Sequence, residues 1–253
     1  MGKYSGILLC SDFDGTLFKG GKIPENNLKA IREFRKEGGL FTVISGRDVG
    51  FLPPFFEGYS FGVPVANLNG AVIYDIDSER VIRESFMSGL TRELVLCYAK
   101  SAGEYEDVIF FPGNEILRFA KEKVDSVTEE HCKNTYKFIV ELHSDSSPEQ
   151  SDAAYRAVKS AVGDKFDVVR SSYRLIEILD KRLTKASAAL FLKEYVGADT
   201  LVCVGDFEND IDMVKAADIG YAVGNSVDAL KLVADRVTVD AAEGAIAKII
   251  SEL

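Results

Sequence analysis

Short apolar runs that alternate with helical segments mark the beginning of this 253-residue chain. Strands are expected at residues 7–10, 40–44 and 64–66, and a helix is expected to open at Pro24 and to end at residues 38–39. A short continuous apolar run is typical of a strand that is covered on both faces, as in a parallel sheet. The alternation of such runs with helices therefore predicts βαβ crossovers and an α/β fold.

The same alternation returns in the last third of the chain. An apolar stripe near the C-terminus indicates that the chain closes with an amphipathic helix. The other elements expected there are helices at 185–195 and 211–217 and strands at 201–204, 219–223 and 237–239.

The pattern changes in the middle of the chain. The apolar residues 136, 138, 140 and 142 alternate with Lys137, Ile139 and Glu141, which is typical of a sheet with one face wetter than the other. We therefore predict a core of residues 1–81 and 182–253, interrupted by an inserted α+β domain, residues 82–181, that can move as a unit. Other expected elements of the insert are strands at 108–111, 116–119 and 175–179 and two helices, around 90–98 and 154–162.

Charge and composition narrow the class of protein. Thirty Lys and Arg against forty Asp and Glu leave a net charge of −10, which argues against a nucleic-acid or membrane-surface partner. No apolar run approaches the ~20 residues that a transmembrane helix needs. The four cysteines are scattered and favour buried, reduced thiols, and His131 and His143 form no metal-ligand pattern. We expect a cytoplasmic protein, with the choice between monomer and homodimer left open.

Polar residues follow three of the predicted parallel strands. Asp12-Phe13-Asp14-Gly15-Thr16 comes after the first, Ser45-Gly46-Arg47 after the second, and residues 205–210, including Asp206 and Asp210, after a late one. Ligands of open α/β sheets bind outside the carboxyl ends of the strands. These groups are therefore expected to converge, although they lie far apart in the sequence.

The converging carboxylates predict a metal site. Asp12 and Asp14 are two residues apart and point to the same side of an extended segment. With Asp206 and Asp210 beside them they repel one another unless a cation intervenes, and oxygen ligands select Mg²⁺. Lys185 opens its own helix and is a second source of positive charge. A site with Mg²⁺, a lysine, a hydroxyl and helix N-termini suits a phosphate dianion.

Two of these carboxylates can divide the steps of a phosphoryl transfer. Asp12, held ionised by the metal, can attack phosphorus and form an aspartyl-phosphate. Asp14 can protonate the departing alkoxide and then accept the proton of the water that cleaves the acyl phosphate.

These motifs resemble those of haloacid dehalogenase-superfamily hydrolases, specifically the Cof-like group with a large α+β cap inserted after the third core strand. The resemblance extends over essentially the whole chain. It rests on Asp12-Phe13-Asp14-Gly15-Thr16-Leu17, Ile44-Ser45-Gly46-Arg47, Leu183-Thr184-Lys185-Ala186, residues 205–213, Asn69-Gly70-Ala71 and Gly224-Asn225.

The resemblance implies a Rossmann-like parallel-sheet core, a cap that closes over the substrate, and a role for each matching residue. Asp12 would be the nucleophile and Asp14 the general acid and base, while Ser45 and Lys185 would hold the phosphoryl oxygens. Mg²⁺ would be bound by Asp12, by the backbone carbonyl of Asp14 and by Asp206, with Asn209 and Asp210 supporting the site; Asp210 is kept as a candidate ligand. Candidate substrate-binding residues are Gly46, Arg47, Asn69, Gly70 and Asn209, and Arg47 could instead pair with an acid.

The chain departs from the group's pattern at Phe207 and in the approach to Lys185, residues 180–184. The insert is also short for a Cof-like cap, which admits a resemblance to archaeal-type phosphoglycolate phosphatases. We predict a Mg²⁺-dependent phosphatase acting on a small phosphomonoester, such as a sugar phosphate. A phosphotransferase or phosphomutase that uses the same aspartyl-phosphate, and a non-catalytic phospho-ligand-binding protein, stay open as alternatives.

Overall fold

The computed structural model of the chain describes residues 2–56, 60–113 and 115–253. It divides into two compact units, the first formed by Met1–Arg83 and Thr184–Leu253 and the second by Glu84–Leu183. Every candidate site residue from the sequence lies in the first unit and within the described residues. Among the described residues, no helix combines the length and hydropathy that a bilayer crossing requires.

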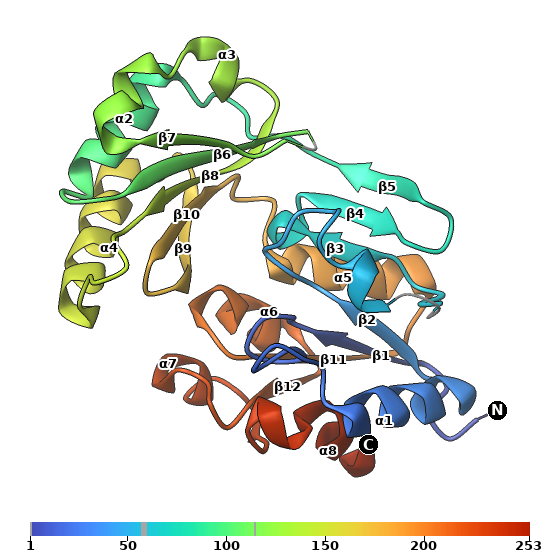
Figure 1. Cartoon of the computed structure of the whole chain (residues 1–253). Coiled ribbons are helices and arrows are strands. Elements are labelled where there is room, and N and C mark those ends of the chain that lie inside the picture. The colour runs from blue at the N-terminus through green and yellow to red at the C-terminus, as the bar shows by residue number, and fades with distance from the viewer. Residues whose placement is uncertain (1, 57–59, 114) are drawn as a thin grey trace. The chain divides into compact units, whose positions relative to one another are not determined.

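The centre of the first unit is a parallel five-stranded sheet (Figure 1). Each strand pairs in parallel with its neighbour, and β1 lies between the late strand β11 and the early strand β2. The expected α/β core with a parallel sheet is therefore confirmed. In spatial order, the strands are β13 (Arg236–Val237), β12 (Ile219–Ala222), β11 (Thr200–Gly205), β1 (Ile7–Ser11) and β2 (Leu40–Val43).

Helices cover both faces of this sheet. On one face, α1 (Glu25–Lys36) and α8 (Ala245–Glu252) contact each other and pack on the strands. On the other face lie α5 (Lys185–Val196) and α6 (Ile211–Ala216), and the short α7 (Asp228–Lys231) packs against β12. Because both faces are buried, the strands read as continuous apolar runs in the sequence.

A smaller sheet adjoins β2 in the same part of the chain. It contains β3 (Val65–Asn67), β4 (Val72–Asp75) and β5 (Arg80–Glu84), and an isolated parallel bridge between Ile44 and Ala66 connects β3 to the end of β2. The sequence pattern did not predict β4 and β5. β5 is largely exposed and shows no apolar run, whereas β4 does have a short apolar run, residues 72–74, that was not recognised as a strand.

The second unit is built on an antiparallel sheet of its own. Helices α2 (Arg92–Ser101) and α4 (Pro148–Val162) contact each other, and their apolar residues share a core with the sheet, while α3 (Glu129–Cys132) is a single turn. The inserted α+β fold class is thus confirmed; its role as a cap remains a prediction. In spatial order, the strands are β7 (Leu117–Ala120), β6 (Asp107–Pro112), β8 (Thr135–Glu141), β10 (Leu175–Leu179) and β9 (Asp167–Ser172).

Two expectations about burial were wrong. Lys137 on β8 was assigned to a wetter sheet face, but it is buried because it forms an ion pair with the equally buried Glu177 on β10, at 2.7 Å. Cys97 was expected to be buried and is exposed, whereas Cys10, Cys132 and Cys203 are buried; all four thiols are free.

Candidate active site

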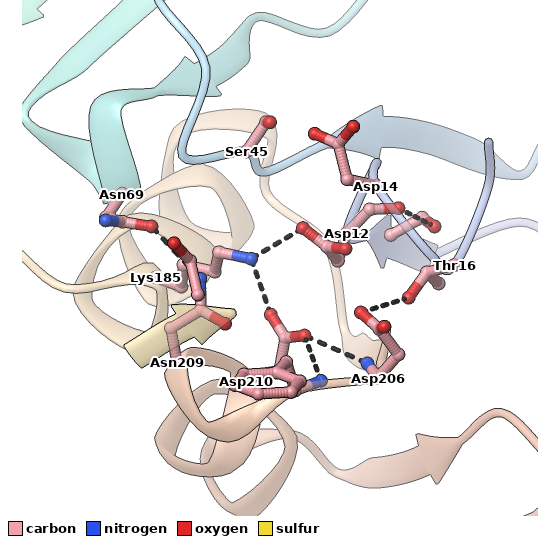
Figure 2. Close-up of polar contacts among 12 residues, drawn as sticks. Asp12, Asp14, Thr16, Ser45, Asn69, Lys185, Asp206, Asn209 and Asp210 are labelled. Atoms are coloured by element: carbon pink, nitrogen blue, oxygen red, sulfur yellow. Dashed lines mark hydrogen bonds and ion pairs between the residues drawn. The ribbon is translucent and has the colours of Figure 1, made fainter. Parts of the chain in front are cut away.

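The two acidic residues after β1 lie in different surroundings. The Asp12 backbone N–H donates to the Val204 carbonyl at 3.0 Å, which extends the pairing of β1 with β11 and fixes Asp12 at the edge of the sheet. The Asp12 side chain is buried, while that of Asp14 is 42% exposed. Asp12 is therefore fixed in the interior of the site and Asp14 lies at its rim (Figure 2).

Lys185 connects two of the acidic motifs. Thr184 caps α5 by accepting a hydrogen bond from the Ser187 backbone N–H at 3.2 Å, so the helix begins at Lys185. The Lys185 Nζ lies 2.5 Å from Oδ1 of Asp12 and 2.6 Å from Oδ1 of Asp210. All three side chains are buried, and Figure 2 shows them meeting from three separate segments.

Asp210 also shapes the loop that carries Asp206. Its Oδ2 accepts hydrogen bonds from the backbone N–H groups of Asp206, at 2.9 Å, and of Phe207, at 3.2 Å. Carboxylate oxygens of Asp12, Asp206 and Asp210 all lie within 4.8 Å of one another. Since both oxygens of Asp210 accept hydrogen bonds, its position fits a supporting role for the cluster.

Burial and mutual repulsion perturb the ionisation of this cluster. Burial, followed by the charges of Asp210 and Asp206, raises the pKa of Asp12 well above its usual range, despite the opposing effect of Lys185. Burial and the charge of Asp210 raise the pKa of Asp206 to about 7. Burial alone would lower the pKa of Lys185, but its two carboxylate partners outweigh burial and raise it, so Lys185 stays protonated. The three acids thus outnumber their one cationic partner.

A left-handed turn after β3 holds the Ser45 loop. Leu68, Asn69 and Gly70 have φ values of 51°, 57° and 99°, and strained backbone of this kind persists only where its surroundings enforce it. The Asn69 N–H donates to the Ser45 carbonyl, and the Leu68 N–H to the Arg47 carbonyl, both at 2.9 Å. A Cβ on Gly70 would lie 2.8 Å from the Thr184 carbonyl oxygen, so this turn also packs against the start of α5.

Ser45 and Arg47, in the loop after β2, differ in burial and in their partners. Ser45 is buried, and its Oγ accepts a hydrogen bond from the Arg47 backbone N–H at 3.1 Å, with the half-buried Gly46 between them. The Arg47 side chain binds both oxygens of Asp14 and lies over the ring of Phe51, 4.2 Å from its centroid. In this structure Arg47 therefore pairs with an acid, and its place among the substrate-binding residues stays a prediction.

Two residues of the site were not assigned a role from the sequence. The Thr16 hydroxyl donates to Oδ1 of Asp206 at 3.3 Å, and the Asn67 side chain donates to the carbonyls of Arg47 and Asp48 at 3.3 and 3.0 Å. Thr16 belongs to the first acidic motif and Asn67 directly follows the strand expected at residues 64–66, so the position of each in the sequence could have indicated a role. The Asn209 side-chain amide donates to Oδ1 of Asn69 in a long hydrogen bond of 3.4 Å.

Comparisons with known proteins find a matching family model and several similar named proteins. A family model described as haloacid dehalogenase-like hydrolase matches residues 9–250. The chain is 25% identical over 260 residues to the Bacillus subtilis 5-amino-6-(5-phospho-D-ribitylamino)uracil phosphatase YitU, covering 97% of this chain and 96% of that protein. It is 29% identical over 165 residues to an Archaeoglobus fulgidus phosphoglycolate phosphatase, covering 57% of this chain and 72% of that one.

Solved structures share the fold over nearly the full length. A haloacid dehalogenase-like hydrolase from B. subtilis superposes with a TM-score of 0.79 at 22% identity, covering 97% of this chain and 99% of that one. The HAD subclass IIB sugar phosphatase BT4131 superposes with a TM-score of 0.75 at 20% identity, covering 97% and 98% of the two chains.

Proposed function

The chain belongs to the haloacid dehalogenase-like hydrolases, as its Cof-like motifs predicted, and from this premise we propose that it is a Mg²⁺-dependent phosphatase of a small phosphomonoester. The observation that carries the proposal is the contact of Lys185 with both Asp12 and Asp210, beside Asp206. Such a cluster combines a buried carboxylate nucleophile with fixed positive charge for a phosphoryl group.

The residues of the cluster fit a divalent cation. Three carboxylates lie close together with one ammonium group, and burial together with their mutual repulsion raises the pKa values of Asp12 and Asp206, which a divalent cation would counter. The ligand atoms are all oxygens, which Mg²⁺ prefers. Asp12, Asp206 and the Asp14 backbone carbonyl would hold Mg²⁺, with Asp210 in support. Bound there, Mg²⁺ supplies charge stabilisation to the phosphoryl oxygens during transfer.

Asp12 and Asp14 share the bond-making and proton-transfer steps. An Asp12 oxygen attacks phosphorus while the bond to the leaving oxygen breaks, and Asp14 gives that oxygen its proton. Water then attacks the aspartyl-phosphate, Asp14 takes up the water proton, and phosphate and the Asp12 carboxylate are released. The difference in exposure supports this division, because a proton donor to the leaving group must be reachable from the rim of the site.

Lys185 and Ser45 would bind the non-reacting phosphoryl oxygens. The lysine ammonium has three protons, and its contacts with Asp12 and Asp210 use two of them. The Ser45 hydroxyl accepts from the Arg47 N–H, which leaves its own proton to be donated.

The substrate is proposed to be a compact metabolite phosphate. Both YitU and BT4131 are named as phosphatases of small molecules, and a chain with a large inserted unit is suited to such substrates. Gly46, Asn69, Gly70 and Asn209 stay candidate substrate-binding residues, and the unit Glu84–Leu183 is the proposed cap. Arg47 is proposed to act on the substrate indirectly, by orienting Asp14. A cytoplasmic location and a monomeric or homodimeric state also remain predictions.

Phosphate release tests the proposal directly. The protein is assayed on a panel of sugar phosphates, phosphoglycolate and nucleotide phosphates, with Mg²⁺ and with EDTA. We expect Mg²⁺-dependent release, abolished in Asp12→Asn and retained in Asp145→Asn, a matched change at an exposed position. Normal turnover by Asp12→Asn would refute the aspartyl-phosphate route.

One additional assay distinguishes the alternative functions. Including a free sugar in the assay and looking for phosphorylated sugar distinguishes transfer to a hydroxyl from transfer to water. Tight binding of panel members without turnover would instead indicate a phospho-ligand-binding protein.

A further inference from the structure

Asn225 joins two segments that are distant in sequence. Its Nδ2 donates to the Gly15 carbonyl at 2.9 Å, and its Oδ1 accepts from the Ala241 backbone N–H at 2.9 Å. An amide held at both ends has one orientation, because its donor and acceptor cannot be exchanged without losing both hydrogen bonds. Asn225 therefore fixes the Gly15 carbonyl relative to the C-terminal part of the core.

Gly15 lies directly against Asp206. It has a φ of +82°, and a Cβ placed on it would be only 2.2 Å from Oδ2 of Asp206. The next residue, Thr16, donates its hydroxyl to the other oxygen of Asp206. Any shift of the turn that contains Asp14 and Gly15 would thus change its spacing from Asp206.

The loop that carries Asn225 is itself fixed to the Asp206 side. The Val227 N–H donates to the Asp206 carbonyl at 3.0 Å, while the Ser226 hydroxyl donates to the Val223 carbonyl at 2.6 Å and lies 3.1 Å from the Gly205 carbonyl. The loop of residues 225–227 therefore binds the Asp206 segment through the Val227 N–H and the turn at Gly15 through the Asn225 side chain. The loop spans the two segments whose separation defines the acidic site.

A second connection joins the segment after Gly15 to the C-terminal part of the core, and it is weaker. Lys19 forms an ion pair with Asp240 at 2.8 Å, but both side chains are about one-third exposed. Exposed pairs of this kind contribute little because water and salt screen them. The partly buried Asn225 amide is the better candidate for setting the spacing.

We propose that Asn225 is a positioning residue that holds the Asp14–Gly15 peptide at the distance from Asp206 at which both can bind one Mg²⁺ ion. The inference rests on the proposed function, which assigns the Asp14 carbonyl and Asp206 to that ion. Asn225 itself touches neither the ion nor the substrate; it acts through the Gly15 carbonyl.

Titration of Mg²⁺ alone into the substrate-free protein tests this role. Asn225→Ala removes both hydrogen bonds, and its Mg²⁺ dissociation constant should rise by at least about tenfold, the usual effect of losing a group that orients a metal ligand. The KM for substrate at saturating Mg²⁺ should change by less than about threefold. Lys19→Ala, which breaks the neighbouring ion pair, should stay within about twofold of the unmodified protein.

The possible outcomes are distinct. An unchanged Mg²⁺ dissociation constant in Asn225→Ala, together with a lower melting temperature, would assign Asn225 a purely structural role and overturn the proposal. Absence of Mg²⁺ binding by the unmodified protein would overturn it too. If Asn225→Ala does not fold, Asn225→Ser takes its place, because serine is too short to reach the Gly15 carbonyl. The same Mg²⁺ dissociation constant and KM are then measured for Asn225→Ser. A protein that binds Mg²⁺ but hydrolyses nothing would refute the proposed function alone, since the titration needs no substrate.

Discussion

Arg47 binds Asp14 at two points, from Nε at 2.8 Å and from Nη2 at 2.9 Å. A two-point pair fixes the plane of the carboxylate as well as its position. The same contact raises the pKa of Arg47, so its charge is retained at any working pH. Because Phe51 packs under the guanidinium, the proposed acid and base is held in a defined orientation before substrate binds.

Arg47→Lys should lower kcat by roughly tenfold to a hundredfold, because lysine keeps the charge but cannot form the two-point pair. Steady-state kinetics on the best panel substrate measures the effect, with Arg32→Lys on the exposed face of α1 as the control. A raised KM with unchanged kcat would instead place Arg47 on the substrate.

Asp14→Asn should slow both chemical steps, by roughly 10² to 10⁴ each, since one group serves as acid and then as base. The leaving group separates the two steps. With an aryl phosphate, whose phenolate leaves without protonation, the first step should recover and phosphoenzyme should accumulate in rapid-quench experiments. Equal losses with alkyl and aryl phosphates, and no accumulation, would argue against this assignment.

Mg²⁺ binding should depend on pH through Asp206. Burial and the charge of Asp210 raise the pKa of Asp206 to about 7, so below pH 7 its carboxyl must lose a proton before it can bind the cation. The Mg²⁺ dissociation constant should therefore fall by at least about tenfold per pH unit up to pH 7, and any further fall above pH 7 belongs to Asp12, whose pKa burial also raises. Calorimetry in buffers of different ionisation enthalpy should find more proton release at pH 6 than at pH 8; a flat profile would contradict the prediction.

Gly15→Ala should impair the site far more than Gly20→Ala. Both glycines have positive φ, so each alanine carries a backbone cost of about 1 kcal/mol. Only at Gly15 would the new Cβ meet Asp206, whereas no atom lies within 4 Å of a Cβ on Gly20. Chemical denaturation should show similar backbone costs, and only Gly15→Ala should also weaken Mg²⁺ binding. Equal Mg²⁺ affinities for the two variants would contradict the prediction.

The core and its acidic motifs could be predicted from the sequence because their signals are local. A strand buried on both faces is largely apolar, as at residues 7–10, and a polar residue directly after it must lie at the edge of the sheet. The parallel order that brings β1 beside β11 then places Asp12 near Asp206. The strand β5 was missed because it is largely exposed, which removes the apolar signal, whereas β4 carries a short apolar run that was not recognised as a strand.

Burial in the second unit illustrates what local patterns leave undecided. The alternation in β8 correctly indicates a strand, but whether Lys137 faces water depends on the strand beside it. Glu177 on β10 supplies an opposite charge, and a paired ammonium can be buried where a single one cannot.

The sequence alone determined the chemistry available to this protein, because the types and order of its strand-end residues are written along the chain. The tertiary structure decided how these residues are paired. The contacts of Arg47 with Asp14, 33 residues away, and of Asn225 with Gly15, 210 residues away, depend on how separate loops pack over the sheet. Hydrogen bonds form only within narrow limits of distance and angle, and these limits are met by folded geometry that no local residue pattern encodes.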